Sequence, residues 1–348
     1  MKPRALIAMS GGVDSTVAAL ETLKAGYDCF GVTMKLCDIP DACGSGSDAA
    51  DAKAVCDRLG MPHEVLDLQK EFENGVIRPF VAAYEAGQTP NPCILCNRSL
   101  KFGLLWEKAR ALGCEILVTG HYARTESAGG RVLLQKARCA AKDQSYVLYR
   151  LTQDELAHLR FPLGNYESKE QVRAVAAENG FSSAAKKDSQ DICFVPDGDY
   201  YGFLRRYTGK DYPAGDFLDG DGHPVGRHAG LPRYTVGQRK GLGIALGEPM
   251  YVKEKNVAAN TVTLVRNEAL FASEMLVGDV NRIVPFGGEP FRAQVKPRYK
   301  AAAANATLTP LPDGTLRVAF DEPQRALTPV QSAVFYDQET VLGGGIIL

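Results

Sequence analysis

The sequence predicts an α/β protein: a doubly wound parallel sheet, then a small central domain and a C-terminal antiparallel β-barrel. Three observations indicate this fold class. Apolar strands alternate with helices up to about residue 180, a stretch rich in Gly, Asp and Pro occupies 201–249, and short alternating strands fill the remainder. The expected domains are therefore residues 1–200, 201–256 and 257–348.

The first strand is expected at ALIAMS (5–10), a short apolar run that ends in a glycine turn. Apolar side chains at helical spacing follow in 14–25, and Gly26 ends that helix. Three further strands are expected at 28–36, 63–68 and 114–123, and one further helix at 47–60. Such alternation forms a parallel sheet with helices on both faces, whose ligands bind beyond the carboxyl ends of the strands.

The later elements have equally local signals. Thr152 with Glu155, and Ser168 with Gln171, have the spacing of capping boxes, so two helices are expected within 152–180. Short strands at regular spacing predict the barrel. These strands are expected at TVTLV, RAQVKPRY, ATLTPL, LRVAF, AVFYD and TVLGGGIIL.

Composition limits the classes of partner. The 348 residues carry a net charge of −1, so a nucleic-acid partner, if there is one, must meet a local basic patch. Neither DNA nor a membrane is expected as a partner. The start MKPRALIAMSGG has too short an apolar run for a signal peptide or a membrane span, which predicts a cytoplasmic protein. The nine cysteines are then expected to be thiols. Those that occur singly are expected to be small buried hydrophobes: Cys29, Cys56, Cys114 and Cys139.

The stretch SGGVDS (10–15) joins the first strand to the first helix. Its glycines let backbone N–H groups approach a phosphate, and the helix dipole adds positive potential at the same point. Asp14 and Ser15 supply polar oxygens at the helix start. The lysine of the Walker pattern is missing, so this is a different kind of phosphate loop.

The order of strand, SGG, acidic residue, serine and helix resembles the PP-loop of the ATP pyrophosphatases. The resemblance implies an adenine nucleotide α hydrolase-like fold, cleavage of ATP between the α- and β-phosphates, and adenylation of a substrate oxygen. It implies that ATP and Mg²⁺ bind at the loop, where Ser10, Gly11, Gly12, Asp14 and Ser15 hold the pyrophosphate. The other cofactor-binding residues that it implies are Ala8, Met9, Val13, Met34 and Gly120.

A pair of thiols lies three residues apart in TPNPCILCN (89–97). Asn91 is expected to cap a helix that begins at Pro92 and continues to about Gly113. Cys93 and Cys96 then lie in its first turns, where free N–H groups and the helix dipole favour thiolates. A distant thiol, Cys193, follows a Lys-Lys-Asp cluster in KKDSQDICF (186–194); by itself it is typical of a core residue.

Taken together, the segments make the chain similar to the tRNA-specific 2-thiouridylases along nearly its whole length. The matching segments are AMSGGVDS, TPNPCILCN, TGHYAR, KDQSYVLYRL, KKDSQDICF, YTVGQRKGLG, EPQRALTP and the GGG near the end. The resemblance implies a sulfurtransferase that adenylates O2 of the wobble uridine of tRNA and replaces it with sulfur from a cysteine persulfide. A cysteine desulfurase or a relay protein would supply that sulfur.

The family's functional residues carry over to specific positions. Cys193 would hold the persulfide, and Cys96 would either free the sulfide or form a transient Cys96–Cys193 disulfide. Met34 and Gly120 would line the adenine side. The implied tRNA contacts are Asn91, Pro92, Cys93, His121, Lys142, Asp143, Gln144, Arg298, Tyr299 and Gln331.

The sequence departs from the family in three places. Cys93 stands where many relatives have Asp, so Cys93, Cys96 and Cys193 are possible ligands of a [4Fe-4S] cluster, for which three thiolates and one open position are suited. A catalytic zinc is less expected, since no fourth ligand is evident. TPVQ replaces the usual TPGQ before Gln331, and the 36–48 loop adds Cys37 and Cys43, for which incidental thiols are the favoured interpretation.

Two other functions compete with RNA thiolation. One is a PP-loop ligase or amidotransferase that acts on a small molecule, which would need neither Cys96 nor Cys193. The other is a non-catalytic RNA-binding or iron–sulfur protein with a vestigial glycine loop, against which the intact Asp14 argues.

Overall fold

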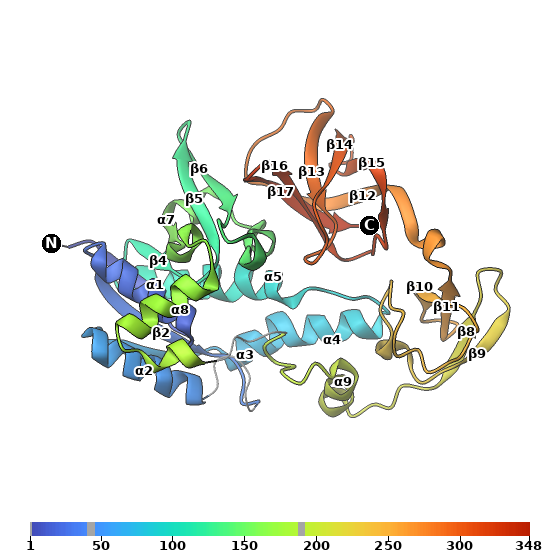
Figure 1. The fold of residues 1–348 in the computed structure, drawn as a ribbon, viewed down its shortest axis with the longest axis horizontal. Coiled ribbons are helices and arrows are strands. Elements are labelled where there is room, and N and C mark those ends of the chain that lie inside the picture. The colour runs from blue at the N-terminus through green and yellow to red at the C-terminus, as the bar shows by residue number, and fades with distance from the viewer. Residues whose placement is uncertain (1, 40–45, 187–191) are drawn as a thin grey trace.

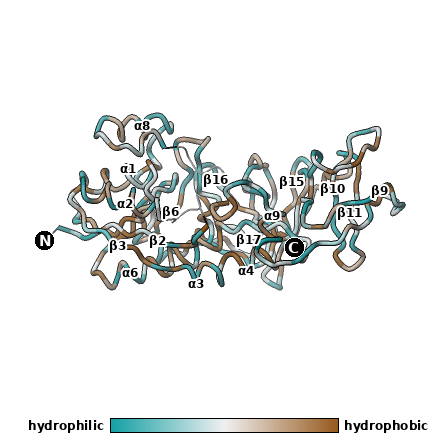
Figure 2. The backbone as a smooth tube through the Cα atoms, turned by 90° about the horizontal axis from the view of Figure 1, so that it is seen from below, coloured by the Kyte–Doolittle hydropathy of each residue, from teal (hydrophilic) through white to brown (hydrophobic). Residues whose placement is uncertain are grey.

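A computed structural model describes residues 2–39, 46–186 and 192–348 of the chain. The fold is elongated, with a parallel-sheet region at one end, a small sheet of strands β8 to β11 at the other, and a barrel beside them (Figure 1). The view from below shows the same order along the long axis (Figure 2). Within the described residues, no helix combines the length and the apolar run that crossing a bilayer requires. The doubly wound sheet, the central domain and the C-terminal barrel predicted from the sequence are confirmed.

The parallel sheet has the strand order β3-β2-β1-β4-β7. Its central strand β1 is buried because Ala5, Leu6 and Ile7 are completely inaccessible to solvent. The strands are β1 (Arg4–Ala8), β2 (Asp28–Lys35), β3 (His63–Asp67), β4 (Ile116–Val118) and β7 (Leu159–Arg160). The order reverses direction between β1 and β4, which is the position where ligands bind in open sheets of this kind.

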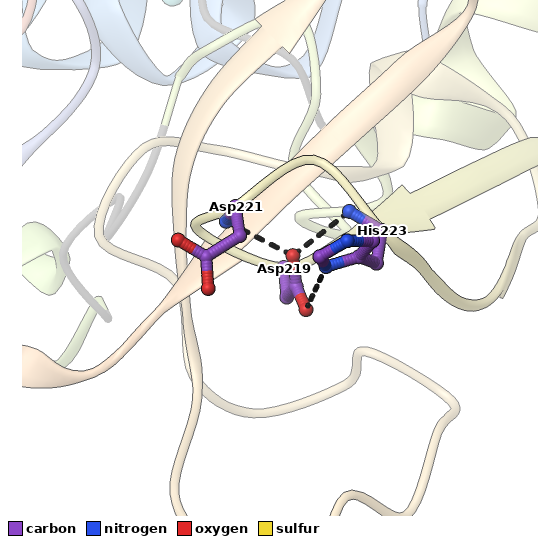
Figure 3. Close-up of side chains that lie close together, drawn as sticks. All are labelled: Asp219, Asp221 and His223. Atoms are coloured by element: carbon purple, nitrogen blue, oxygen red, sulfur yellow. Dashed lines mark hydrogen bonds and ion pairs between the residues drawn. The ribbon is translucent and has the colours of Figure 1, made fainter.

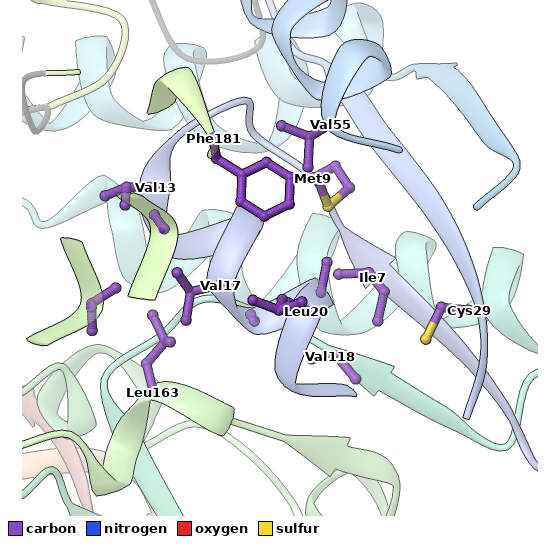
Figure 4. Close-up of a cluster of buried hydrophobic side chains, with 14 of the residues drawn as sticks. Ile7, Met9, Val13, Val17, Leu20, Cys29, Val55, Val118, Leu163 and Phe181 are labelled. Carbon is purple, nitrogen blue, oxygen red and sulfur yellow. The ribbon is translucent and has the colours of Figure 1, made fainter. Parts of the chain in front are cut away.

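Helix α1 (Val13–Lys24) packs its apolar face against this sheet (Figure 4). Val13 and Val17 lie in one cluster with Ile7 of β1 and Val118 of β4, as the helical spacing in the sequence requires. The helix ends where predicted, because Gly26 adopts a φ of 91° and returns its N–H to the Leu23 carbonyl. The other helices of this region are α2 (Gly46–Leu59), α3 (Gln69–Phe72), α4 (Arg78–Glu85), α5 (Pro92–Cys96), α6 (Leu105–Ala111), α7 (Gln153–His158) and α8 (Lys169–Glu178).

Two parts of the parallel-sheet region differ from the prediction. The segment 152–180 contains both helices but also β7, two residues that extend the sheet beside β4. The residues after β4 form a hairpin of β5 (Ala123–Ala128) and β6 (Arg131–Lys136), which pairs with the barrel through Gln135 and Thr340. A two-residue strand has no periodicity, and the hairpin is stabilised by its contact with a distant part of the chain.

The central sheet has the order β10-β11-β8-β9 and is joined to the first region through α9 (Tyr200–Thr208). Its strands are β8 (Gly215–Leu218), β9 (Pro224–His228), β10 (Tyr251–Asn256) and β11 (Thr261–Val265). β11 is the TVTLV run that the sequence placed in the barrel; it pairs instead with β8 and β10. Alternation shows that a strand exists, and only its partners show which sheet it joins.

The barrel is closed because β12 pairs with both β15 and β17. Its strand order is β12-β15-β14-β13-β16-β17, and its interior is filled by aliphatic residues, Met275, Phe320 and Phe335. The strands are β12 (Phe271–Arg282), β13 (Phe291–Lys296), β14 (Ala304–Pro310), β15 (Leu316–Arg325), β16 (Ser332–Asp337) and β17 (Thr340–Ile347). The sequence missed β12, whose apolar positions alternate only over Met275 and Val277.

The barrel is docked on the segment 145–153 of the first region. Tyr146 donates a hydrogen bond from its hydroxyl to the Ser332 carbonyl at 2.7 Å, and Asn281 donates from its side-chain amide to the carbonyls of Tyr149 and Leu151. Tyr146 and Tyr149 are fully buried in one cluster with Val334 of the barrel. Aromatic burial with satisfied polar tips makes this a specific contact.

Candidate functional site: a nucleotide cavity beside a thiol cluster

The phosphate loop lies directly beyond β1, at the switch point of the sheet. Gly11 has a φ of 70°, and a Cβ added to it would lie 2.6 Å from the Asp48 carbonyl oxygen, so only glycine fits. The loop is held by serine hydroxyls: Ser15 donates to the Gly12 carbonyl at 3.0 Å, and the Ser10 N–H donates to the Ser15 hydroxyl at 3.2 Å. The sequence therefore builds a rigid turn with the α1 N-terminus facing outward, which favours an anion.

Asp14 is held by two residues that the sequence analysis did not single out. Lys169 Nζ lies 2.7 Å from each carboxylate oxygen of Asp14, and the Tyr122 hydroxyl donates to Asp14 Oδ1 at 2.7 Å. Lys169 also lies over the Tyr122 ring, 5.7 Å from its centre. Tyr122 and Lys169 are 108 and 155 residues away from Asp14 in the sequence, so no local pattern could have revealed these contacts.

A cavity of about 220 Å³ opens between the loops that follow β1 and β4. Gly120 permits their close approach, since a Cβ there would lie 3.0 Å from the Asp14 carbonyl carbon. Of the predicted cofactor-binding residues, seven line the cavity and Gly11, Gly12 and Val13 form the adjoining turn. The seven are Ala8, Met9, Ser10, Asp14, Ser15, Met34 and Gly120.

The properties of the cavity match an adenine nucleotide. Its apolar side is formed by Val32, Met34 and Leu36, which suits a base, and its polar side by the phosphate loop. Asp14 offers carboxylate oxygens of the kind that Mg²⁺ prefers when it bridges phosphates. The residues present therefore fit ATP with Mg²⁺, because the base, phosphate and metal requirements each meet a matching group.

The thiol helix is built as its sequence predicts. The Asn91 side chain accepts from the Cys93 N–H at 3.1 Å, and Pro92 occupies the first helical position of α5. Cys93 is exposed, whereas Cys96 is only 7% exposed. The helix continues after Cys96 through the π-helical stretch 97–104 before α6, an irregularity that is frequent at functional sites.

Cys193 and Cys96 belong to the same hydrophobic cluster, although 97 residues separate them in sequence. Cys193 lies in a turn closed by the Val195 N–H and the Ile192 carbonyl at 2.9 Å. The next residue, Phe194, anchors this turn by packing against the rings of Phe72, Phe80 and Phe203. Cys193 itself is half-buried at the edge of the cluster.

The nucleotide cavity and the thiol cluster share a wall. Leu36 lines the cavity and is a buried member of the cluster, and Met34 lines the cavity and packs against the cluster. Cys37, from the loop after β2, is a further buried member of the cluster, whereas Cys43 and residues 187–191 lie outside the described residues. The cluster that holds Cys96 and Cys193 therefore meets the predicted ATP site at Met34 and Leu36.

The single cysteines are inert, as predicted. Cys29, Cys56, Cys114 and Cys139 are all buried. Burial, aided by the negative charge of Asp28, raises the pKa of Cys29 to about 12, and burial likewise raises the pKa of Cys56 to about 12. At neutral pH Cys29 and Cys56 are therefore thiols rather than nucleophilic thiolates.

Several predicted tRNA contacts gather where the barrel meets the thiol helix. Gln331 donates a hydrogen bond to the Thr89 carbonyl, directly before α5. Tyr299, 38% exposed, packs against Tyr146 with the ring centres 5.6 Å apart and the planes tilted by 59°, and burial together with the charges of Asp143 and Cys93 raises the pKa of its phenol. Val330, which precedes Gln331, adopts a φ of 71° that a β-branched residue takes only at a cost, so the replaced glycine of TPGQ has a conformational consequence.

Three other predicted tRNA contacts, His121, Asp143 and Gln144, are hydrogen-bonded to neighbouring groups of the protein. His121 is 7% exposed, lines the nucleotide cavity and is hydrogen-bonded to Thr119 at 2.7 Å; burial holds its pKa well below the usual 6.5. Asp143 accepts hydrogen bonds from the Ala137 and Ser145 backbone, and Gln144 accepts from the Tyr122 N–H. Lys142 lies in the adjoining 3₁₀ turn, and its charge offsets a part of the rise in the pKa of the Tyr299 phenol.

Arg298 lies between the barrel and the central sheet. Burial, and then the charge of Arg325, lower the pKa of its guanidinium. The guanidinium groups of Arg298 and Arg325 both lie near Gly237, and Arg325 donates a hydrogen bond to the Gly237 carbonyl at 3.2 Å. Two neighbouring arginines at a glycine turn form a local positive site.

Asp219, Asp221 and His223 are the group of potential metal ligands that the structure brings together within its described residues (Figure 3). Their hydrogen bonds explain this arrangement without an ion. Asp219 accepts from the backbone N–H groups of Asp221 and His223, both at 2.9 Å, and thereby closes the turn between β8 and β9.

The parallel sheet with its phosphate loop, acidic residue and adenine-sized cavity defines a PP-loop protein that uses ATP. Its N-terminal region, residues 3–197, matches the tRNA methyl transferase HUP domain. Residues 201–266 match the tRNA methyl transferase PRC-barrel domain, and residues 272–347 match the aminomethyltransferase beta-barrel domain.

Curated relatives cover the whole chain. It is 45% identical to the tRNA-specific 2-thiouridylase of Clostridioides difficile, covering 100% of this chain and 98% of the relative. It is 46% identical to that of Acetivibrio thermocellus, with 99% of each covered. The chain belongs to the tRNA-specific 2-thiouridylase family, which confirms the resemblance expected from its motifs.

Proposed function

We propose that this protein catalyses the ATP-dependent 2-thiolation of the wobble uridine of tRNA. Membership of the family supports this reaction, and one structural observation carries it: Met34 and Leu36 separate the nucleotide cavity from the cluster that contains Cys96 and Cys193. In this proposal, the oxygen is activated in the cavity and the thiols approach it from the cluster that Met34 and Leu36 border. A ligase acting on a small molecule would have no use for the second half of this arrangement.

In the first half of the proposed reaction, O2 of the uridine attacks the α-phosphorus of ATP and pyrophosphate leaves. The loop of Ser10 to Ser15 binds the phosphates through backbone N–H groups, and the α1 dipole stabilises the charge that develops on the leaving group. Mg²⁺ would be held by Asp14 and the phosphates. The adenylated oxygen then becomes a good leaving group.

In the second half, the terminal sulfur of a Cys193 persulfide attacks C2 of the uridine, and AMP leaves. The thiolate of Cys96 then attacks the Cys193 sulfur, which breaks the S–S bond to the base, releases 2-thiouridine and forms a Cys96–Cys193 disulfide. A dithiol reductant must restore the two thiols. Alternatively, Cys96 attacks the persulfide first and frees a sulfide that reacts with C2.

The substrate and the sulfur donor approach from different sides in this proposal. Asn91, Pro92 and Cys93 would lie against the extruded base, because the exposed Cys93 is beside Tyr299. Arg298 and Gln331 would bind the tRNA from the barrel. The half-buried Cys193 would receive its sulfur from a cysteine desulfurase or a relay protein, and the reaction would take place in the cytoplasm, where tRNA is modified.

The test is a reconstituted reaction with undermodified tRNA, ATP, Mg²⁺ and a persulfide donor. We expect one pyrophosphate released for each 2-thiouridine formed, measured by enzymatic pyrophosphate detection and nucleoside mass spectrometry. Pyrophosphate release that needs no tRNA, with no thiouridine formed, would contradict the proposal and favour a small-molecule ligase.

The same preparation tests the iron–sulfur variant of the reaction. In that variant Cys93, Cys96 and Cys193 would hold a [4Fe-4S] cluster, which would carry the sulfide. Purification without oxygen, followed by iron and sulfide analysis, distinguishes the two routes. Full thiolation by iron-free protein supports the persulfide route, and activity in proportion to bound iron supports the cluster.

A further inference from the structure

We infer that Lys169 is the phosphate-binding lysine of this enzyme, supplied to the PP-loop from the first turn of α8. The loop SGGVDS contains no lysine, whereas Walker-type loops carry one that contacts the phosphates. Lys169 lies 155 residues from Asp14 in sequence and 2.7 Å from its carboxylate in space. The inference rests on the proposed function, since it assigns a residue to the ATP site.

The burial of Lys169 is unusual within this molecule. At 6% exposure, it is the one buried side chain among the lysines, arginines, aspartates and glutamates of the described residues. Removing an ammonium group from water costs several kcal/mol, of the order found for buried ions generally. This cost must be offset by favourable interactions of the ammonium group, and the Asp14 carboxylate provides them.

The helix position of Lys169 adds a second cost. It is the first residue of α8, after the Ser168 cap, where the helix dipole disfavours a positive charge. Leucine or alanine would suit both the burial and the helix start better. The N-termini of α1 and α8 meet at the Asp14–Lys169 pair, and the amide groups of both favour an anion at this point.

The contacts of Lys169 place it directly behind a residue that lines the cavity. Its partner Asp14 lines the cavity, and its other neighbour, Tyr122, bonds through its N–H to the cavity residue Gln144. With Mg²⁺ and ATP bound, Asp14 would hold the metal and Lys169 would donate to phosphate oxygens. The ammonium then replaces one bond to a carboxylate oxygen by one to a phosphate oxygen, so no buried charge is left unpaired.

The competing lysines near the site have other environments. Lys186 is half-exposed and pairs with Asp48 and Asp51, on the far side of Gly11. Lys101 lines the cavity, and its charge lowers the pKa of the buried His121. These two are the alternatives against which Lys169 must be tested.

The first experiment uses the wild-type protein and an ATP analogue whose γ-phosphate carries an acyl group. A nearby amine attacks the acyl carbon, forming an amide and releasing ATP, so peptide mass spectrometry identifies the lysine beside the phosphates. We expect acylation of Lys169 that excess ATP prevents. Acylation of Lys101 or Lys186 without Lys169 would overturn the inference. If the protein bound no ATP at all, the proposed function would fail instead.

The second experiment measures ATP affinity by calorimetry. We expect Lys169→Met to weaken ATP binding roughly ten- to hundredfold, the effect of losing a hydrogen bond between charged groups. Lys53→Met, which removes an exposed lysine paired with Asp57, should leave the affinity unchanged. In metal-free buffer, a Lys169 that only neutralises Asp14 would make the Asp14→Asn, Lys169→Met double variant bind like Asp14→Asn alone. A phosphate-binding Lys169 leaves the double variant weaker.

Discussion

The two halves of the candidate site differ in the polarity of the side chains that form them. Around the phosphate loop, hydroxyl, carboxylate, ammonium and backbone groups are fixed by hydrogen bonds near 3 Å, as between Asp14 and Lys169. Around the thiols, the neighbours are aromatic and aliphatic, with Phe194 as the anchor of the Cys193 turn. Phosphoryl chemistry needs charges held in place, whereas sulfur transfer needs thiols kept from bulk water but able to approach one another.

This contrast makes the two halves separable by mutation. Damage at the polar half should stop adenylation without affecting the sulfur carried on Cys193. Damage at the apolar half should stop thiolation without affecting ATP binding. The following predictions are arranged from the largest expected effect to the smallest.

Replacing a catalytic thiol tests the apolar half most directly. Cys193→Ser or Cys96→Ser should reduce thiouridine formation by at least about a thousandfold, as loss of a nucleophile does, while ATP affinity is unchanged. Nucleoside mass spectrometry and calorimetry measure the two effects. The matched control is Cys29→Ala, which removes a buried thiol whose pKa burial raises to about 12. Thiolation that survives in Cys193→Ser would rule out the persulfide mechanism.

Replacing Asp14 tests the polar half. Asp14→Asn should lower the rate of tRNA-dependent pyrophosphate release by about a hundredfold, because the carboxylate that would hold Mg²⁺ against the reacting phosphates is lost. Loading of persulfide onto Cys193, measured by thiol-trapping mass spectrometry, should be unaffected. Asp57→Asn, at an exposed ion pair, is the control and should behave as wild type. Loss of persulfide loading in Asp14→Asn would show that the halves are not separable.

Removing the anchor of the Cys193 turn tests the role of packing. Phe194→Ala should lower the free energy of unfolding by about 3–5 kcal/mol, since a fully buried aromatic ring leaves a cavity. Urea denaturation measures this loss, and Phe271→Ala, at an exposed ring, should show little of it. Under conditions where the variant is folded, thiolation should fall while ATP binding persists. An unchanged thiolation rate would mean that Cys193 needs no fixed turn.

The polar half also predicts a pH effect. Burial lowers the pKa of His121 in the folded protein, so the unfolded chain binds a proton first as the pH falls below about 6.5. The stability due to neutral His121 is therefore complete above pH 6.5 and is lost towards lower pH, at up to about 1.4 kcal/mol for each pH unit. Urea denaturation from pH 7.5 to 5 should show a smaller loss for His121→Asn than for wild type. Equal losses would place the titration elsewhere, on His63 or His228, whose pKa values burial also lowers.

The sequence by itself determined the local parts of this protein. The glycine turn, the Asn91 cap with Pro92, and the Thr152 capping box with Glu155 depend on neighbouring residues, and each forms as its pattern predicts. The change of composition after residue 200 indicated the order of the domains, and the family resemblance added Cys193 as a candidate catalytic thiol. Such features are readable because short-range sterics and hydrogen bonds decide them.

Only the tertiary structure decided which distant groups meet. It brought Lys169 and Tyr122 to Asp14, placed β11 in the central sheet rather than the barrel, and buried His121 in the cavity wall. It also put Cys96 and Cys193 into one cluster, behind a wall shared with the nucleotide cavity. Burial and long-range pairing are properties of the packed chain, because the energy of a charge or a strand depends on partners that no local stretch of sequence contains.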